Sequence, residues 1–205
     1  PNGPANSYRW RLFTVASAIL TITCLLAIGS LAARDNFVTR GIPAALPQPI
    51  DQGGTRLGVN VHLAQYEEDL PEVLAEIQNT GIEYLKQTFY FSDEFDWQLS
   101  DRIIRAVEAQ GLQLVPLLDG DPATGFAPPA DVQEYAAWTA EFARRYGDSV
   151  NHYIIWDEPN LSSHWGNAPV NPNHYAAILT AAAEAIRRED PDAVIIAGPL
   201  APTSE

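Results

Sequence analysis

Short apolar runs alternate with amphipathic stretches from residue 56 onward. Apolar runs that predict strands lie at residues 57–63, 82–91, 112–118, 150–156 and 193–197. Amphipathic stretches that predict helices lie at residues 70–80, 99–110, 131–146 and 172–189. Strand followed by helix, repeated along the chain, predicts right-handed crossovers and a parallel sheet. Either an open doubly wound sheet or part of a (β/α)8 barrel fits this order.

An uncharged apolar run occupies residues 12–33, with Arg9 and Arg11 before it and Arg34 after it. As a helix it would span about 30 Å, the thickness of a membrane's hydrocarbon core. We therefore predict one transmembrane signal-anchor helix. The alternatives are a buried core helix and a signal peptide cleaved near residues 30–32. Arg9 and Arg11 favour a cytoplasmic N-terminus and an extracytoplasmic remainder, which would be secreted if the signal were cleaved.

The chain divides by composition into segments. We expect a short cytoplasmic N-terminus at 1–11, the membrane helix at 12–33, a Pro/Gly-rich linker at 34–55 and the α/β domain at 56–205. The domain has room for about five βα units, whereas a complete barrel needs about 250 residues. We therefore expect an incomplete (β/α)8 TIM barrel, and a chain that is a piece of a longer product.

The chain is acidic, and this excludes some partners. A formal charge of −14 with 46% hydrophobic residues is typical of a folded protein and disfavours binding to nucleic acid.

Cys24 is the single cysteine in the sequence, so neither a disulfide framework nor a cysteine metal site can be built from it. The sequence contains neither a Gly-x-Gly-x-x-Gly nor a Walker motif, so we expect no cofactor, and we expect no metal. The oligomeric state is not indicated.

Polar side chains gather along the predicted strands and after their ends. They include Asn60, His62, Lys86, Asp119, Asp157 and Glu158. A barrel predicts this pattern, because the carboxyl ends of its parallel strands share one rim.

The fourth strand is followed by the most informative motif, Trp156-Asp157-Glu158-Pro159-Asn160-Leu161, with His164-Trp165-Gly166 after it and Tyr175 in the next helix. This motif resembles the fourth-strand region of retaining (β/α)8 glycoside hydrolases of clan A, where the usual text is Trp-Asn-Glu-Pro-Asn. Residues 190–199 resemble the fifth strand of the xylosidase-like and cellulase-like branches. The resemblance implies that Glu158 is the general acid/base of a glycosidase acting on O-glycosyl bonds.

Glycoside hydrolysis gives the motif a chemical sense of its own. The reaction needs one protonated carboxyl to donate to the leaving oxygen and, with retention, a second carboxylate roughly 5–5.5 Å away as nucleophile. Pro159 cannot extend a strand, so Glu158 is expected at the strand's carboxyl end, and Asn160 is expected to anchor the following loop. The alternative is that Asp157 and Glu158 are capping or solvated loop acids.

We expect several further residues to contact a carbohydrate substrate. The candidates are Asp157, Trp165, Asn60, His62, Lys86, Asp119 and His164. Trp165 would be either a platform on which a sugar stacks or a lid over the barrel end. The two histidines could instead be hydrogen-bonded structural residues.

The sequence departs from the family at Asp157, where the family has an asparagine that donates a hydrogen bond to the sugar, because an ionised Asp can only accept. Lys86 stands where an arginine is common. The family's nucleophile follows the seventh strand, so we expect it outside these 205 residues, which alone should be inactive. The alternatives are a non-catalytic carbohydrate-binding domain and a membrane-complex interaction domain.

Overall fold

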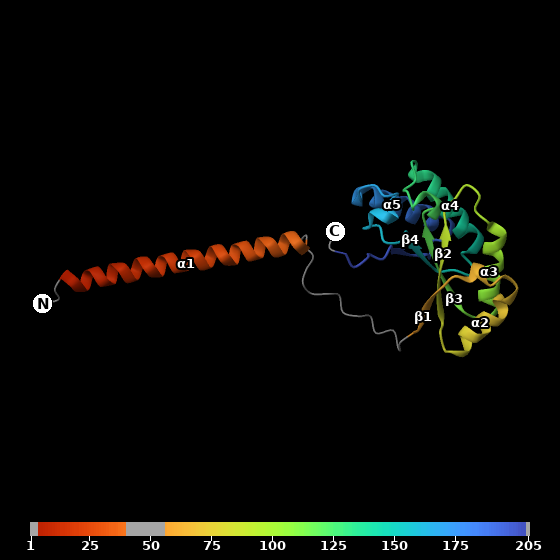
Figure 1. The fold of residues 1–205 in the computed structure, drawn as a ribbon, viewed down its shortest axis with the longest axis horizontal. Coiled ribbons are helices and arrows are strands. Elements are labelled where there is room, and N and C mark those ends of the chain that lie inside the picture. Colours follow the sequence, from red (N-terminus) through yellow and green to blue (C-terminus); the bar gives the residue numbers. More distant parts are fainter. Residues whose placement is uncertain (1–3, 40–55, 204–205) are drawn as a thin grey trace. The chain divides into compact units, whose positions relative to one another are not determined.

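The computed structural model describes residues 4–39 and 56–203, which form parts of two compact units. The first unit contains one helix, α1 (Pro4–Thr39), drawn in red and orange in Figure 1. Residues 9–34 of this helix are exposed, and an 18-residue window within Arg9–Arg34 has a mean hydropathy of 2.2. Three of its threonines, Thr14, Thr21 and Thr23, each donate a hydrogen bond to the carbonyl four residues earlier. By length and composition the helix could cross a membrane, a criterion that a signal sequence near an N-terminus also meets.

Helix α1 is longer than the predicted membrane segment. It already includes residues 4–11, and it continues through Thr39, so residues 34–39 are helical rather than part of a linker. No proline or glycine interrupts the sequence between Gly29 and Gly41, which is why an extended segment does not begin at Arg34. The rest of the predicted linker, residues 40–55, lies outside the described residues.

The second unit, Gly54–Glu205, is built on a parallel sheet of five strands. The strands are β1 (Gly58–Val61), β2 (Tyr84–Tyr90), β3 (Gln113–Asp119), β4 (His152–Ile155) and β5 (Val194–Ala197). They lie side by side in sequence order, and every neighbouring pair is parallel. A doubly wound sheet reverses its strand order at a switch point, whereas a barrel does not. The structure therefore confirms the parallel βα repeat and has the strand order of part of a barrel.

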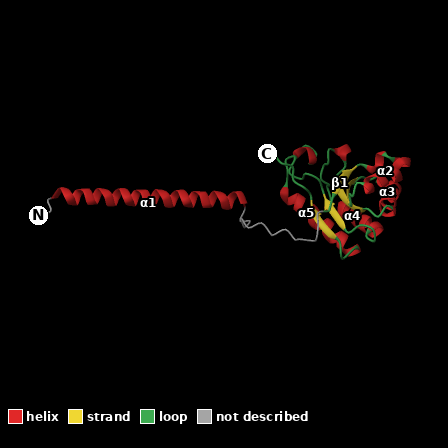
Figure 2. Cartoon of the chain, turned by 90° about the horizontal axis from the view of Figure 1, so that it is seen from below, coloured by secondary structure: helices red, strands yellow, loops and turns green. Residues whose placement is uncertain are grey.

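Four helices follow the strands: α2 (Leu70–Asn79), α3 (Trp97–Ala109), α4 (Val132–Tyr146) and α5 (Pro172–Glu189). Asp96, Asp131 and Asn171 cap the last three, each accepting backbone N–H groups of the first turn. The Asp96 cap places the start of α3 at Trp97, two residues earlier than predicted. In Figure 1, α2, α3 and α4 lie along one side of the sheet, and Figure 2 shows the strands among the helices.

The core lies between the sheet and these helices. Alternate residues of β2, namely Leu85, Gln87 and Phe89, are buried, and Phe89 packs edge-on against Phe142 of α4 at 5.0 Å between ring centroids. The intervening residues point to the other face, because successive strand side chains alternate. In register, Asn60 pairs with Lys86 and Tyr90 pairs with Asp119, so these polar side chains share that other face. The helix-covered face of the sheet is thus mainly apolar, and the other face carries Lys86, Tyr90 and Asp119.

Candidate active site at the carboxyl end of β4

The backbone after β4 is held in an unusual conformation. Trp156 has φ of +68° and Glu158 has φ of +40°, both in the left-handed region. This region costs a residue with a side chain roughly 1–2 kcal/mol. The amide of Trp156 still donates to Leu118 of β3 at 2.9 Å, so the strand pairing ends only where the turn begins. The sequence around β4 therefore directs Glu158 away from the regular path of the strand.

Trp156 anchors this turn. Its side chain is fully buried, packs edge-on against Tyr135 and Trp165, and donates through Nε1 to the carbonyl of His164 at 3.2 Å. Gly120, directly after β3, makes room for the ring, because a Cβ there would lie 2.8 Å from Trp156 Cη2. The indole thus joins the ends of β3 and β4 to the η4 turn (Ser162–His164).

Glu158 and His164 face each other at the rim. Glu158 Oε2 lies 3.8 Å from His164 Nε2, with side-chain exposures of 34% and 22%. The other ring nitrogen, Nδ1, lies 3.3 Å from the Asp157 carbonyl oxygen, and the ring stacks on Phe126 at 4.6 Å with 18° between planes. A carbonyl only accepts hydrogen bonds, so this contact requires a proton on Nδ1. A neutral His164 then presents the unprotonated Nε2 to the Glu158 carboxyl.

Asp157 is paired with two of the other predicted residues. Its Oδ1 lies 3.8 Å from Lys86 Nζ, with both side chains about a quarter exposed, and its backbone N–H donates to Asp119 Oδ1 at 3.1 Å. The Lys86 ammonium partly offsets the extra negative charge that an aspartate brings to this position. The aspartate therefore has a cationic partner in the fold.

Asp119 is the buried carboxyl of the site. Its exposure is 2%, and loss of solvation raises the pKa of Asp119 to about 6, above the ordinary value of 3.8. Backbone hydrogen bonds from Gly120 and Asp157 lower this pKa, while the charge of Asp157 raises it. Partial burial, followed by the charges of Asp119 and Asp157, also raises the pKa of the Tyr90 hydroxyl. The negative charges of Asp119 and Asp157 thus both act on the Tyr90 hydroxyl, and the charge of Asp157 also acts on Asp119.

Asp119, Asp157 and His164 each offer a metal-ligand atom, and these atoms lie within 4.8 Å of one another. The three residues are engaged in other contacts: Asp119 with the Asp157 amide, His164 with the Asp157 carbonyl, and Asp157 with the Lys86 ammonium. A cation placed here would meet the positive charge of Lys86. These contacts favour a hydrogen-bonded and ion-paired network, and the absence of a metal stays a prediction.

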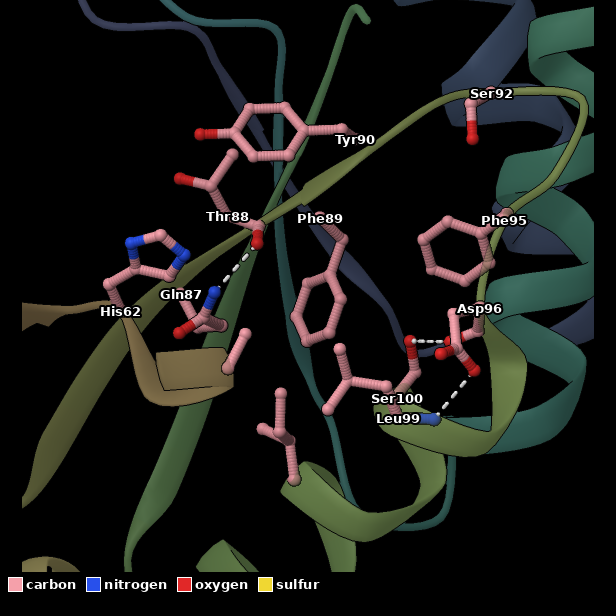
Figure 3. Close-up of a pocket in the computed structure, with 12 residues that line it drawn as sticks. His62, Gln87, Thr88, Phe89, Tyr90, Ser92, Phe95, Asp96, Leu99 and Ser100 are labelled. Carbon is pink, nitrogen blue, oxygen red and sulfur yellow. Dashed lines mark hydrogen bonds between the residues drawn. The ribbon is translucent and has the colours of Figure 1, made fainter. Parts of the chain in front are cut away.

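The remaining predicted residues lie apart from Glu158 or are buried. Asn60 is exposed on β1, beside Lys86 in register. His62 is exposed and lines a different cavity of about 190 Å³ between β2 and α3, where Figure 3 shows it near Gln87 and Thr88. Trp165 is 2% exposed and packs on Trp156, so its ring has no open face for a sugar. Its burial favours the lid alternative.

The loops after β4 and β5 are tied together. Asn160 donates through Nδ2 to the Ala201 carbonyl and accepts from the Ala201 amide through Oδ1, both at 2.9 Å, which confirms the predicted anchoring role. The Tyr175 hydroxyl donates to the Ile155 carbonyl at 3.1 Å and accepts from the Gly198 amide at 2.7 Å. These bonds fix the rim on the β5 side of Glu158.

Sequence patterns did not single out two residues of this site. Phe126 holds the His164 ring by stacking, and Gly120 accommodates Trp156. Gly120 lies two residues after the predicted strand end at residue 118, and that position was a usable signal. Phe126 lies in a loop without periodicity, so nothing in the local sequence indicated its contact.

Comparison with known proteins identifies the fold but no family. No family model matches the chain, and a search of curated proteins finds no match. A glucosidase from Croceicoccus marinus is similar in structure, with a TM-score of 0.58 and 16% identity over 73% of this chain and 38% of its own. The endoglucanase Cel5A of Thermotoga maritima has a TM-score of 0.53 and 20% identity over 71% and 52%.

The catalytic domain of the Thermobifida fusca endoglucanase Cel5A gives a TM-score of 0.53 and 21% identity over 74% of this chain and 50% of its own. The chain thus spans about 38–52% of the length of these three proteins. At these identities the similarity shows the fold, the five-stranded part of a barrel, and leaves the chemistry to be argued from the site.

Proposed function

We propose that residues 56–203 are part of a retaining (β/α)8 glycoside hydrolase of clan A, and that Glu158 is its general acid/base. The observation that carries the proposal is the position of Glu158. It follows β4 at the carboxyl end of a parallel sheet, its backbone turns out of the strand with φ of +40°, and its carboxyl faces the His164 ring at 3.8 Å. Catalytic groups of barrel enzymes occupy this end of the strands.

In the proposed mechanism Glu158 begins as a carboxylic acid. It donates its proton to the glycosidic oxygen as the bond to the leaving group breaks, while a carboxylate nucleophile bonds to the anomeric carbon. Glu158, now ionised, then removes a proton from water, which attacks the same carbon and releases the nucleophile. His164 Nε2 lies 3.8 Å from Glu158 Oε2, so the imidazole borders the carboxyl without a direct hydrogen bond.

The second carboxylate is the incomplete part of this proposal. Among the described residues, the acids near Glu158 are Asp157 and Asp119, and both are engaged, with Lys86 and with the Asp157 amide respectively. We infer that the nucleophile comes from a residue beyond the five-stranded unit. The 205 residues alone are then expected to be inactive.

The finer parts of the proposal concern substrate and location. Several structural neighbours are named as glucosidases and endoglucanases, which supports a poly- or oligosaccharide as the substrate class, and we propose that its linkages are β. We propose that α1 anchors the enzyme in a membrane with its barrel extracytoplasmic, since Arg9 and Arg11 precede the apolar segment. Cleavage of α1 as a signal sequence would give a secreted enzyme instead.

The test is turnover by the full-length protein on a panel of β-glycosides with unactivated leaving groups. Glu158→Gln should lower kcat by about 10²–10⁴-fold with little change in KM, because it removes the proton donor and keeps the side chain's shape. Glu184→Gln, which changes an exposed residue of α5, is the matched control and should leave kcat unchanged. Equal turnover by wild type and Glu158→Gln would contradict the proposed role.

A non-catalytic carbohydrate-binding domain is the second candidate, and Asp157 is the observation that favours it. An aspartate paired with Lys86 replaces the sugar-binding asparagine of the family pattern. Binding of oligosaccharide by the full-length protein, measured by calorimetry, together with no turnover of any glycoside on the panel, would support this candidate over the enzyme.

A further inference from the structure

The peptide backbone of Asp157 is held from both sides by side chains of other elements. Its N–H donates to Asp119 Oδ1, at the end of β3, at 3.1 Å. Its carbonyl accepts from His164 Nδ1, in the η4 turn, at 3.3 Å. We propose that Asp119 and His164 are positioning residues, a clamp on the Asp157 backbone that fixes the direction of Glu158. This inference rests on the proposed function and assigns the two residues to positioning rather than to sugar contact.

The conformation of the turn explains why a clamp is needed. Asp157 lies between two residues in the left-handed region, Trp156 and Glu158. Such a conformation persists for residues with side chains only when their surroundings hold it. Trp156 is held by its buried indole, but the side chain of Glu158 is one-third exposed and lies 3.8 Å from the neutral His164 ring. The clamp therefore supplies the restraint nearest to Glu158.

The Asp119 half of the clamp is strong because of its surroundings. Asp119 is 2% exposed, and a buried carboxylate accepts a stronger hydrogen bond from a backbone N–H than a solvated one does. The titratable groups around it are Tyr90 of β2, Tyr135 of α4, and Asp157 and His164 of the β4–α5 loop, with Lys86 bound to Asp157. Its pKa of about 6 means that acid weakens this acceptor within an ordinary pH range.

The His164 half of the clamp involves both nitrogens of the imidazole ring. Donation from Nδ1 to the Asp157 carbonyl fixes the tautomer, and stacking on Phe126 fixes the plane of the ring. The unprotonated Nε2 then faces Glu158 Oε2 at 3.8 Å, beyond hydrogen-bond distance. The same ring thus holds the backbone before Glu158 and meets the Glu158 carboxyl.

The experiment compares amide hydrogen exchange at Asp157 with leaving-group dependence in the full-length protein. Asp119→Ala removes the acceptor, and Asp119→Asn keeps an acceptor oxygen without the charge. Asp121→Ala is the matched control, since it removes a similar carboxylate bond to the Ala123 amide two residues away. His164→Ala removes the other half of the clamp. Exchange is read by mass spectrometry at single-residue resolution, and kcat is read with an unactivated β-glycoside and with a glycosyl fluoride.

We expect Asp119→Ala to accelerate exchange at Asp157 about tenfold or more relative to Asp121→Ala, and Asp119→Asn to restore most of the protection. Turnover of the unactivated glycoside should fall about tenfold or more in Asp119→Ala and His164→Ala, with KM little changed, since a misplaced acid is costly. The fluoride, which leaves without a proton donor, should change less than about threefold. Asp119→Asn should recover turnover and shift the acid limb of the pH profile.

Two results would overturn the clamp. Exchange at Asp157 equal in Asp119→Ala and Asp121→Ala would show that Asp119 does not hold the amide, whether or not the protein turns over any glycoside. Equal losses on the glycoside and the fluoride would show that the effect is not on the acid. If Glu158→Gln retained full activity while Asp157 exchange responded as expected, the proposed function would fail and the clamp would stand as a structural device.

Discussion

In the second unit, the helix-covered face of the sheet and the rim after β3 and β4 are stabilised by different interactions. On the helix-covered face, Phe89, Phe142 and their neighbours are buried and meet edge-on at ordinary aromatic distances. At the rim after β3 and β4, Asp119 and Asp157 carry charge, and Trp156 and Glu158 hold left-handed backbone. The first region gains stability from apolar burial, and the second spends it on a fixed polar geometry.

The difference shows where the chemistry of this fold is concentrated. The core could exchange one apolar side chain for another of similar volume and keep its shape. At the rim, each polar contact is made by a specific donor and acceptor from a different element, as with Asp119 and the Asp157 amide. Substitutions on the helix-covered face should therefore change mainly the stability of the fold. Substitutions at the rim should change mainly the protonation and geometry of the site.

The largest expected loss of stability is on the helix-covered face. Phe142→Ala should lower the free energy of unfolding by about 3–5 kcal/mol, because the fully buried ring leaves a cavity among Phe89, Trp138 and Tyr146. Phe142→Leu, which keeps most of the volume, should cost less than about 1.5 kcal/mol. Urea unfolding of both variants measures the two losses. A loss below about 1 kcal/mol in Phe142→Ala, which is the size expected for a surface substitution, would contradict a tightly packed core.

The next effect tests the rim through pH. Because the folded pKa of Asp119, about 6, lies above the ordinary value of 3.8, the folded state binds the extra proton between these values. The free energy of unfolding should therefore fall as pH rises from about 4 to about 6, by up to roughly 3 kcal/mol, and then level off. Urea unfolding across this range should show a flatter profile for Asp119→Asn and an unchanged one for Asp121→Asn. A profile that Asp119→Asn leaves unaltered would refute the assignment.

Gly120→Ala joins the two regions and has a smaller expected effect. Its Cβ would lie 2.8 Å from the buried Trp156 ring, so overpacking should cost about 1–3 kcal/mol. Gly111→Ala is the comparison: its Cβ meets nothing within 4 Å, and its φ of +67° alone should cost about 1 kcal/mol. Only Gly120→Ala should also speed amide exchange at Asp157. Identical amide exchange at Asp157 in Gly120→Ala and Gly111→Ala would show that the packing of Trp156 does not hold the turn.

The smallest effect is expected on the solvent side of the helices. Glu141 accepts from Arg144 and Arg145 at 2.6–2.7 Å, and the hydrogen bond from Arg144 leads in lowering the pKa of Glu141 to about 2. Its lowered pKa stabilises the fold above the ordinary value of 4.5, a contribution that is lost as pH falls toward 2. Because the pair is exposed to solvent, Glu141→Gln should cost only about 0.5 kcal/mol at pH 7 by thermal unfolding. A loss above about 2 kcal/mol would mean that this charge cluster matters more than its exposure implies.

Sequence periodicity predicted the helix-covered face well, because burial leaves a repeating signal. Leu85 and Phe89 alternate on β2, and Ile103, Ile104 and Val107 recur at helical spacing on α3. The predicted start of α3 was two residues late, because the Asp96 cap sets where this helix begins. The choice between barrel and doubly wound order needed the strand neighbours, which periodicity does not encode.

The rim was predictable only in part. Pro159 allowed Glu158 and Asn160 to be placed after the fourth strand, although β4 already ends at Ile155, before the left-handed Trp156. The pairing of Asp157 with Lys86 and of the Asp157 amide with Asp119 depends on contacts between residues distant in sequence. Left-handed backbone at Trp156 was equally hidden, since large aromatic residues rarely adopt it.

Chemical rescue of Glu158→Ala in the full-length protein tests the central claim most directly. A small anion such as azide can enter the space left by the missing carboxyl and attack the glycosyl-enzyme intermediate without needing a base. The account predicts that azide raises turnover of an activated β-glycoside by about tenfold or more and yields the β-glycosyl azide, the product of retention. Turnover that azide leaves unchanged, with only the free sugar as product, would contradict the assignment of Glu158 as the general acid/base.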